Sequence, residues 1–396
     1  MSEMTNTARP HAIVLGLSPT GLYVARELGR CGVPLLGVDR DFASAGTSRY
    51  FRRSVGVWYE PDSVALLQRL VAYARELPGK PVLFPTSDYY IEFVVEHYAA
   101  LNPVFAIADG YAEVATVLMD KMKFHDLCAR HAVATPGVWQ VDSADQIAQF
   151  DQIPFPCILK PTLIHLARPY LRGKKVLVAA DRSELEALWR QLPPASGSWL
   201  IQEIIPGEES GITLSAGYAS EAGIDTFTAR KLRQYPPGFG SASRVISETC
   251  DETREIGRAL IEAIGYRGVY GTEFKRDPRD GKLKIIEINP RPTLWFYLSH
   301  AADKYLVQRA YCDLAGLPLP PQREQRDGIL WHYALKDFAS ALFYRFKGRG
   351  FIFGAPDVSK GGRVKGRCWP VFSLTDPIPF FAELRVYLGK FCRRLF

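Results

Sequence analysis

A predicted β-hairpin over residues 268–291 constrains this chain more than any other segment. It reads GVYGTEFKRD-PRDG-KLKIIEINPR, two strand-like runs joined by a Pro-Arg-Asp-Gly turn of the kind that connects hairpins. Glu287 and Asn289 stand at i and i+2 of the second strand, so their side chains share a face. Antiparallel pairing brings Glu273 of the first strand opposite them. The hairpin therefore predicts two carboxylates and an amide at one place.

These three side chains are typical ligands of magnesium. Carboxylate and amide oxygens are hard ligands, which suit an Mg²⁺ that bridges to phosphates better than they suit zinc. Arg291 is the next residue on the same face and is predicted to neutralise a transferring phosphoryl group. The alternative is a solvated pair of acids. Glu287, however, stands between apolar residues in KIIEINP, where an unpaired carboxylate is costly, and we favour the metal site.

The order of strand and helix signals predicts an α/β and α+β chain with four regions. The first alternates short apolar strands with amphipathic helices, which indicates a small doubly wound, Rossmann-like domain with a parallel sheet. The second is a compact α+β unit, the third is built of long antiparallel strands with one helix near 251–264, and the fourth is a basic extension. The predicted boundaries are 1–115, 116–205, 206–320 and 321–396.

The first strand ends in a turn, Gly16-x-Ser18-x-x-Gly21, that nearly fits a dinucleotide-binding fingerprint. The middle glycine is replaced by Ser18, and Pro19 removes a backbone N–H that could contact phosphate. An NAD-dependent dehydrogenase is therefore a weak hypothesis. Because ligands of such sheets bind beyond the carboxyl ends of the strands, Ser18 and Asp88 are predicted to line one substrate crevice. A helix N-cap is the alternative role for Asp88.

Composition narrows the class of protein. The seven cysteines are scattered without a CxxC pair, which argues against a disulfide framework and a zinc cluster. Neither a signal peptide nor an apolar run long enough to span a membrane is present, so we expect a cytoplasmic protein. The net charge of +7 comes from the end of the chain, where residues 345–396 hold 11 Lys and Arg against 3 Asp and Glu. A local charge excess favours a docking surface and not nucleic-acid binding.

The last 19 residues, 378–396, predict an amphipathic helix. Its apolar residues recur at spacings of three and four and are flanked by basic residues. Packing of this stripe on its own domain is the favoured interpretation. The alternative is peripheral contact with the inner face of an anionic membrane. The stripe consists of Phe381, Leu384, Leu388, Phe391 and Leu395, and the flanking cations are Arg385, Lys390, Arg393 and Arg394.

Five short motifs follow one another along the chain: Asp120-Lys121, ILKP with Lys160, QEIIPG over 202–207, GTEF with Glu273, and EINPR over 287–291. This ordered series resembles the ATP-grasp carboxylate–amine ligases. Each motif is weak alone, and their order and spacing make them specific. Within the superfamily the chain is most similar to D-aspartate ligases and uncharacterised ATP-grasp carboligases. The resemblance implies a Rossmann-like pre-ATP-grasp domain, a small lid domain and a C-terminal grasp domain.

The resemblance also implies the cofactors, ATP and one or two Mg²⁺ ions, with Mn²⁺ as a substitute. The lysines that hold the phosphates would be Lys121 and Lys160. The lid loop departs from the family pattern because Gly173 is its only glycine, so Lys174 or Lys175 is expected to cover the phosphates instead. A second group would hold the nucleoside, with backbone groups at the adenine and an acid at the ribose. These residues are Gln202, Glu203, Ile204 and Ile205 for adenine and Glu209 for ribose. The implied metal ligands are Glu273, Glu287 and Asn289.

The implied reaction is phosphorylation of a carboxylate followed by attack of an amine. Arg291 would act near the transferred phosphoryl group, and Lys231 and Arg233 would grip phosphate or a substrate carboxylate. The substrates would be small molecules, such as amino acids or a cell-envelope precursor. Two alternatives remain open: a small-molecule kinase of the same fold, and a nucleotide-binding regulatory protein that has lost turnover.

Overall fold

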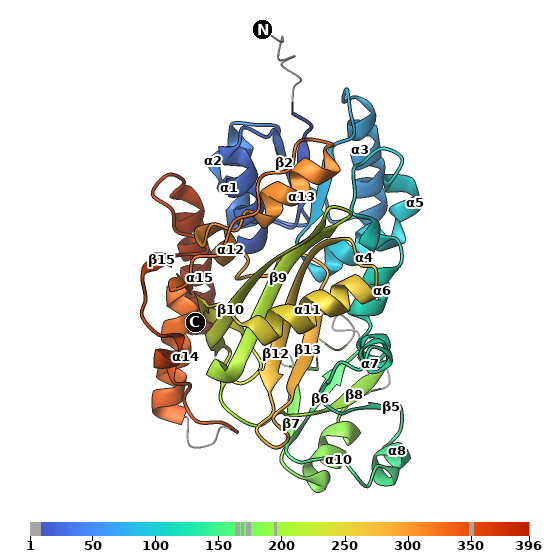
Figure 1. Cartoon of the computed structure of the whole chain (residues 1–396). Helices are drawn as coiled ribbons and strands as arrows, with labels where there is room; N and C mark the ends of the chain where they lie inside the picture. The colour runs from blue at the N-terminus through green and yellow to red at the C-terminus, as the bar shows by residue number, and fades with distance from the viewer. Residues whose placement is uncertain are drawn as a thin grey trace.

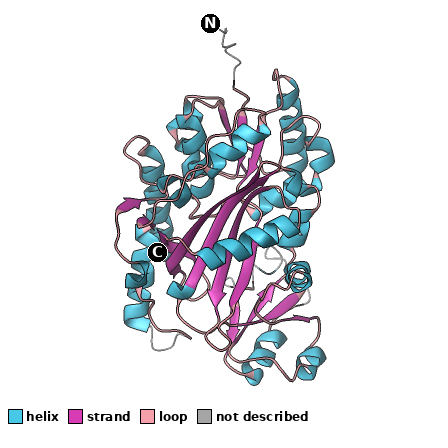
Figure 2. Ribbon diagram, in the orientation of Figure 1, coloured by secondary structure: helices cyan, strands magenta, loops and turns pink. Residues whose placement is uncertain are grey.

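Three β-sheets organise the chain (Figures 1 and 2). The computed structural model describes residues 9–162, 167, 170, 171, 176–193, 196–347 and 352–395. Within these residues, no helix is long and apolar enough to cross a membrane.

The first sheet has four parallel strands in the order β3-β2-β1-β4, which confirms the predicted parallel sheet. Strands β1, β2 and β4 are almost fully buried and apolar, as strands covered on both faces are, whereas the edge strand β3 is half-buried. The elements of this part are β1 (Ala12–Leu15), α1 (Pro19–Arg30), β2 (Leu35–Asp39), η1 (Ser44–Thr47), α2 (Arg49–Arg52), β3 (Gly56–Tyr59), α3 (Ser63–Arg75), β4 (Val82–Pro85), α4 (Asp88–Glu96), α5 (Tyr98–Leu101), η2 (Asp109–Tyr111) and α6 (Val114–Met119).

The second sheet is small and antiparallel, with the order β5-β8-β6-β7. It encloses its own apolar cluster, built around the buried Trp199 and Leu159. In Figure 1 this unit lies at the bottom of the molecule, below the long central strands. Its elements are α7 (Lys121–Arg130), β5 (Val138–Val141), α8 (Ala144–Gln149), β6 (Cys157–Pro161), β7 (Leu177–Ala179), α10 (Arg182–Arg190) and β8 (Trp199–Glu203).

The third sheet is the largest, with seven strands in the order β13-β12-β9-β10-β11-β14-β15. All neighbours are antiparallel except β14 and β15. Helix α11 packs on β9 and β12 through Leu260, Ile261 and Phe274. The elements are η4 (Glu209–Gly211), β9 (Ile212–Ser220), β10 (Gly223–Tyr235), β11 (Ser241–Ser247), α11 (Asp251–Ala263), β12 (Gly268–Arg276), β13 (Leu283–Asn289), α12 (Tyr297–Ala301) and α13 (Leu306–Leu314).

The basic C-terminal region completes this sheet. Residues 329–332 and 366–368 form its last two strands, a contribution that the sequence did not reveal. The four predicted domain boundaries stay a prediction. The elements of this region are β14 (Ile329–His332), α14 (Ala334–Lys347), η6 (Val358–Gly361), β15 (Gly366–Cys368) and α15 (Ile378–Leu395).

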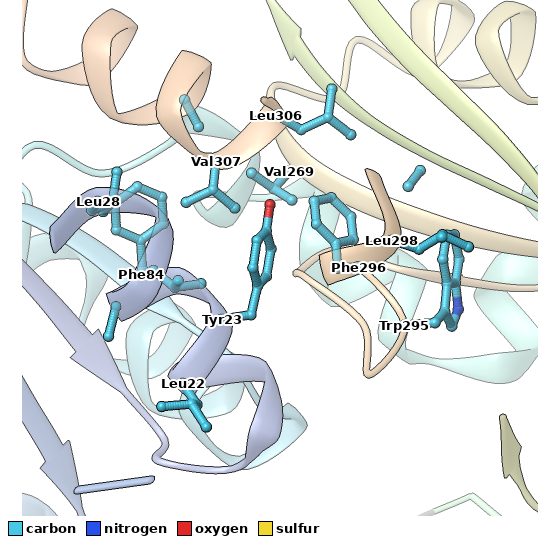
Figure 3. Packing of buried hydrophobic residues seen from close by; sticks show 14 of the residues in the cluster. Leu22, Tyr23, Leu28, Phe84, Val269, Trp295, Phe296, Leu298, Leu306 and Val307 are labelled. Carbon is cyan, nitrogen blue, oxygen red and sulfur yellow. The ribbon is translucent and has the colours of Figure 1, made fainter. Parts of the chain in front are cut away.

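The parallel domain docks on the third sheet through a continuous apolar core. Figure 3 shows Tyr23 and Leu28 of α1 and Phe84 of β4 facing Phe296 and Val307 across this interface. All five side chains are buried. Burial of this extent stabilises the arrangement of the two units, since each large apolar side chain contributes about 1.5–3 kcal/mol.

A buried ion pair ties the C-terminal region to the first domain. The carboxylate of Asp376 accepts hydrogen bonds from Arg26 Nε at 3.0 Å, Ser48 Oγ at 2.7 Å and the backbone N–H of Arg49 at 2.9 Å. Arg26 also donates to the carbonyl of Val371 at 2.8 Å. Since Asp376 lies just before α15, this contact fixes where that helix begins.

Candidate active site

The hairpin predicted from the sequence is present as β12 and β13. Glu273 pairs directly with Glu287, and Gly271 pairs with Asn289. Partners in an antiparallel pair share a face, so Glu273, Glu287 and Asn289 lie together as predicted. The turn closes through the backbone N–H of Gly281, which donates to the carbonyl of Asp277 at 2.8 Å with Gly281 in the left-handed region.

Lys231 of β10 points to the same place. Its Nζ donates to Glu273 Oε2 at 2.5 Å, and the lysine is almost completely buried. A buried ammonium needs such a partner because desolvation of an isolated charge is costly. The structure therefore places Lys231 beside one of the predicted metal ligands, where it can also face a phosphate.

Arg233 does not join Lys231. Register shifts on both sides of Arg233 interrupt the pairing of β10 with β11. Its Nη1 donates to Asp337 of α14 at 3.1 Å, and Asp337 also accepts from His332 at 3.0 Å. The irregular strand thus directs Arg233 to α14, and the predicted contact of Arg233 with phosphate or a substrate carboxylate stays a prediction.

Arg291 links the hairpin to the parallel domain. Its Nε donates to Asp88 Oδ1 at 2.7 Å, and its Nη2 donates to Asn289 Oδ1 at 3.1 Å. Asn289 in turn donates to Glu287 Oε1 at 2.9 Å. The alternative role of Asp88 as a helix N-cap is wrong, since Ser87 caps α4 and Asp88 is the first helical residue. A chain of polar contacts thus runs from the predicted metal ligands to the predicted crevice.

Two lysines approach this cluster from the linking helix and the small sheet. Lys121, at the start of α7, donates through Nζ to the carbonyls of Pro161 and Thr162 at 3.1 Å. Burial lowers the pKa of Lys121, while Glu287 and Asp88 oppose the shift. Burial, with the neighbouring charge of Lys121, lowers the pKa of Lys160 to about 8. Lowered pKa values of two lysines indicate that nearby acidic groups of the protein do not fully offset the cost of burying their positive charges.

The segment predicted to follow the adenine edge leaves the small sheet at the end of β8. Gln202 is buried and pairs with both β5 and β6. Ile204 and Ile205 lie beyond the strand and are buried. The carbonyl of Ile205 accepts a hydrogen bond from Lys275 Nζ at 2.9 Å. The backbone of this segment is therefore held against β12, between the two antiparallel sheets.

Glu203 has a contact that the sequence did not reveal. Its carboxylate accepts from the backbone N–H of Gly137 at 2.8 Å and forms ion pairs with Arg279 and, at 3.6 Å, with Lys284. Arg279 lies in the hairpin turn and Lys284 lies in the strand that follows it, so Glu203 ties the small sheet to the tip of this hairpin.

Glu209 is a structural carboxylate in this conformation. It is almost fully buried, and its two oxygens accept from the backbone N–H groups of Gln234 at 3.0 Å and Gly238 at 2.8 Å. The hydroxyl of Tyr344 donates to the same carboxylate at 2.8 Å. Both oxygens of the Glu209 carboxylate thus have protein donors, and the predicted contact of Glu209 with ribose stays a prediction.

The glycine turn of the parallel domain is shaped by packing. A Cβ on Gly21 would lie 2.0 Å from the carbonyl oxygen of Gly16, so only glycine lets α1 approach β1 this closely. Asp39 accepts from the backbone N–H of Leu17 at 2.6 Å and thereby holds the turn. Ser18 is exposed and caps α1 by accepting from Thr20 N–H at 3.2 Å. Its predicted substrate contact stays a prediction.

Lys275 is a residue that the sequence analysis missed. It stands two positions after Glu273 on β12 and donates to the carbonyls of Ile205 at 2.9 Å and Gly207 at 2.6 Å. Burial lowers its pKa to about 8. The i, i+2 spacing from Glu273 was the signal in the sequence, because it puts both side chains on one face of the strand.

The donor set fits a magnesium–phosphate complex. In the described part of the chain, no group of three or more His, Cys, Asp or Glu side chains is placed to hold a metal ion. The hairpin offers two carboxylates and one amide. Oxygen atoms of phosphate and water would complete the coordination shell of the ion, which is how Mg²⁺ is usually bound with nucleotides. Lys174 lies outside the described residues.

A large surface pocket lies apart from the predicted site residues. It has a volume of about 550 Å³ and is lined by residues that include His11, Pro34, Arg49 and Arg53. Pro34 precedes β2, so this pocket lies at the amino end of the parallel strands, away from the carboxyl ends where Ser18 and Asp88 follow β1 and β4. None of the predicted site residues lines it.

No protein-family model matches the chain. Among curated proteins it is similar to the D-aspartate ligase of Enterococcus faecium, with 22% identity over 231 residues that cover 54% of this chain and 53% of that protein. The chain thus aligns with about half the length of that relative. A formate-dependent phosphoribosylglycinamide formyltransferase of Azotobacter vinelandii is 24% identical over 345 residues, 82% of this chain and 81% of that protein.

Solved structures give a consistent picture of the fold. The ADP complex of an N5-carboxyaminoimidazole ribonucleotide synthetase has a TM-score of 0.61 and 13% identity and covers 81% of both chains. The biotin carboxylase domain of the Hydrogenobacter thermophilus 2-oxoglutarate carboxylase, solved with MgADP and ADP, has a TM-score of 0.60 and 15% identity and covers 81% of this chain and 73% of that one. At these identities the likeness concerns the fold.

Proposed function

We propose that this chain, which has the ATP-grasp fold, is an ATP- and Mg²⁺-dependent ligase that activates a carboxylate as an acyl-phosphate and joins it to an amine. One observation carries the proposal. Burial lowers the pKa of Lys121 and of Lys160, and the charge of Glu287 opposes both shifts; Glu287 belongs to a hairpin with two carboxylates and an amide. Such a site fits a polyanion that arrives with a divalent cation.

The geometry supports phosphoryl transfer by positioning and electrostatics. Glu273, Glu287 and Asn289 would hold magnesium, which supplies charge neutralisation on the phosphates. Arg291 lies between Asn289 and Asp88, so its guanidinium can stabilise charge that develops between the nucleotide and the crevice. No protein nucleophile is required for this chemistry.

The nucleotide and metal assignments have support from the relatives. Two neighbours of the same fold were solved with ADP or MgADP, which supports ATP and a divalent cation, and we propose Mg²⁺ with Mn²⁺ as a substitute. The predicted roles of Gln202, Glu203, Ile204 and Ile205 at adenine belong to this proposal, as does the role of Lys174.

The substrates are proposed as small molecules. D-aspartate ligase and the formyltransferase are named for small substrates, which supports an amino acid or another small carboxylate and amine, including a cell-envelope precursor. Asp88 and Ser18 are the proposed crevice residues. A cytoplasmic location is part of the same proposal. A kinase or an inactive regulatory protein is less favoured, because the hairpin keeps its full set of proposed ligands and its neighbours in the comparisons are ligases.

The test is a measurement of ADP release with pairs of amino acids as candidate carboxylate and amine, with mass spectrometry of the product. We expect substrate-dependent ADP and an amide. Glu287→Gln should lower turnover by at least about a hundredfold, whereas Glu262→Gln, on the exposed face of α11, should leave it unchanged. Full turnover of Glu287→Gln would contradict the metal assignment, and a phosphorylated product without an amide would favour the kinase.

A further inference from the structure

Large apolar side chains that face solvent gather at one end of the chain. Of the 17 such side chains exposed in the described residues, 11 lie between residues 335 and 388. Exposed apolar side chains that occur singly are ordinary, but a concentration of them indicates an interaction surface. The 11 are Leu335, Phe338, Leu342, Phe346, Trp369, Leu374, Ile378, Phe381, Val386, Tyr387 and Leu388.

Helix α14 carries the clearest stripe. Leu335, Phe338, Leu342 and Phe346 recur at spacings of three and four, so they lie on one face. Phe338 is 64% exposed and Phe346 is 74% exposed. Arg345 is the exposed neighbour of this stripe, and its guanidinium lies over the Phe346 ring.

Polar contacts on the inner face fix the rotation of α14. Asp337 binds Arg233, Ser340 donates to the carbonyl of Gln234 at 2.8 Å, and Tyr344 donates to Glu209. Rotation of the apolar stripe inward would break all three contacts and bury polar groups without partners. The outward direction of the stripe is therefore a property of the folded protein.

Helix α15 extends the same surface. Phe381 is 61% exposed and Leu388 is 56% exposed, so the favoured expectation that this stripe packs on its own domain is wrong for these two residues. Arg385 is exposed on the same face, at i+4 from Phe381. The side chains of Phe391 and Leu395 lie outside the described residues. A hydrogen bond from Tyr333 to Glu383 joins α15 to the start of α14, and the two helices lie along one side of the molecule (Figure 1).

The positive charge of the C-terminal region favours an anionic partner over a second copy of this chain. Residues 345–396 contain 11 basic and 3 acidic side chains. Asp376 is buried in its contact with Arg26, Glu383 binds Tyr333, and Asp357 accepts from Ser359. A second copy of the chain would bring the same positive charge against this surface, whereas anionic lipid headgroups complement it and the bilayer interior accepts its apolar side chains.

We propose that α14 and α15 together form a docking surface for an anionic lipid bilayer. The side chains of Phe338, Phe346 and Phe381 enter the boundary between headgroups and acyl chains, and Arg345 and Arg385 lie among the phosphates. The predicted contact of residues 378–396 with a membrane thus becomes a surface of two helices, with α14 supplying the most exposed aromatic side chains. This inference does not depend on the proposed ligase activity.

Co-sedimentation of the full chain with vesicles tests it. We expect binding to vesicles of phosphatidylglycerol and phosphatidylcholine, weaker binding at about 0.5 M salt, and little binding to phosphatidylcholine alone. The double change Phe338→Asp with Phe346→Asp should weaken binding by at least about tenfold. Phe42→Asp, at a side chain that is 62% exposed in the parallel domain, is the matched control and should bind as the unchanged protein does.

A vesicle-free melting curve for each variant shows that it is folded, so loss of binding can be assigned to the surface. If Phe338→Asp with Phe346→Asp does not fold, Phe381→Asp provides the same test in α15. The proposal is overturned if the unchanged chain does not sediment, if it binds neutral vesicles equally well, or if the folded variants bind normally. Light scattering that shows a dimer lost in these variants would also overturn it, because the occupant would then be a second copy.

Discussion

Replacement of Lys160 by methionine should stabilise the free protein and remove nucleotide binding. The pKa of Lys160 falls from the ordinary 10.5 to about 8, first because the side chain is buried and second because Lys121 is near. At about 1.4 kcal/mol per pKa unit, holding this cation costs the free protein about 3 kcal/mol at pH 7. Methionine keeps the length of the side chain without the charge, so the free energy of unfolding should rise by up to about 3 kcal/mol.

The pH dependence follows from the sign of the shift. Because the pKa of Lys160 is lower in the folded protein than in the unfolded chain, the unfolded chain binds the extra proton between about pH 8 and 10.5. The stability of the unchanged protein should therefore rise relative to that of Lys160→Met over this range. The advantage of the variant is largest below pH 8 and disappears near pH 10.5. Lys275, whose pKa is also lowered to about 8, is present in both proteins and cancels in the comparison.

Urea unfolding at pH 7 and pH 10, with calorimetric titration of MgATP at pH 7, measures both effects. Lys282→Met, at an exposed lysine of the hairpin turn, is the control and should change neither quantity by more than about 0.5 kcal/mol. The reasoning is refuted if Lys160→Met is no more stable than the unchanged protein at pH 7. A stability gain that persists at pH 10 would refute the electrostatic cause, and unchanged MgATP affinity would refute the phosphate role.

Three further outcomes are expected. Since Lys160 loses its proton above about pH 8, MgATP should bind about tenfold more weakly at pH 9 than at pH 7, measured by titration; a flat profile would contradict this. Asp376→Ala leaves Arg26 buried without its carboxylate and should lower the free energy of unfolding by about 3–5 kcal/mol in urea; a change below about 1 kcal/mol would show that solvent reaches Arg26. Gly21→Ala, whose Cβ would lie 2.0 Å from the Gly16 carbonyl oxygen, should destabilise the protein by at least about 2 kcal/mol; an unchanged melting temperature would show that α1 shifts freely.

The sequence predicted the central part of the site because that part is local. The turn Pro278–Gly281 and the two-residue period of the flanking strands decide which side chains of the hairpin share a face. Residue spacing alone therefore placed Glu273, Glu287 and Asn289 together, and the pairing of β12 with β13 agrees. The parallel sheet was predictable for the same reason, since strand and helix periods alternate over its whole length.

Other contacts of the site depended on distant parts of the chain. The pairing of β10 with β11 is irregular at Arg233, and the carboxylate of Glu209 accepts a hydrogen bond from Tyr344, 135 residues away. The contact of Glu203 with Arg279 spans two sheets. No local period encodes such pairings, because they depend on how whole sheets and helices are packed.

The sequence by itself therefore determined the alternation of strands and helices in the parallel domain, the hairpin that carries the predicted metal ligands and the basic character of the C-terminal end, since each follows from residue type and spacing along one segment. Tertiary structure alone decided that Arg291 meets Asp88 across 203 positions, that Asp376 anchors α15 at Arg26, and that Phe338 and Phe346 face solvent. The physical reason is that burial and ion pairing depend on which two surfaces of the chain come into contact. Those contacts form only when the sheets and helices pack together.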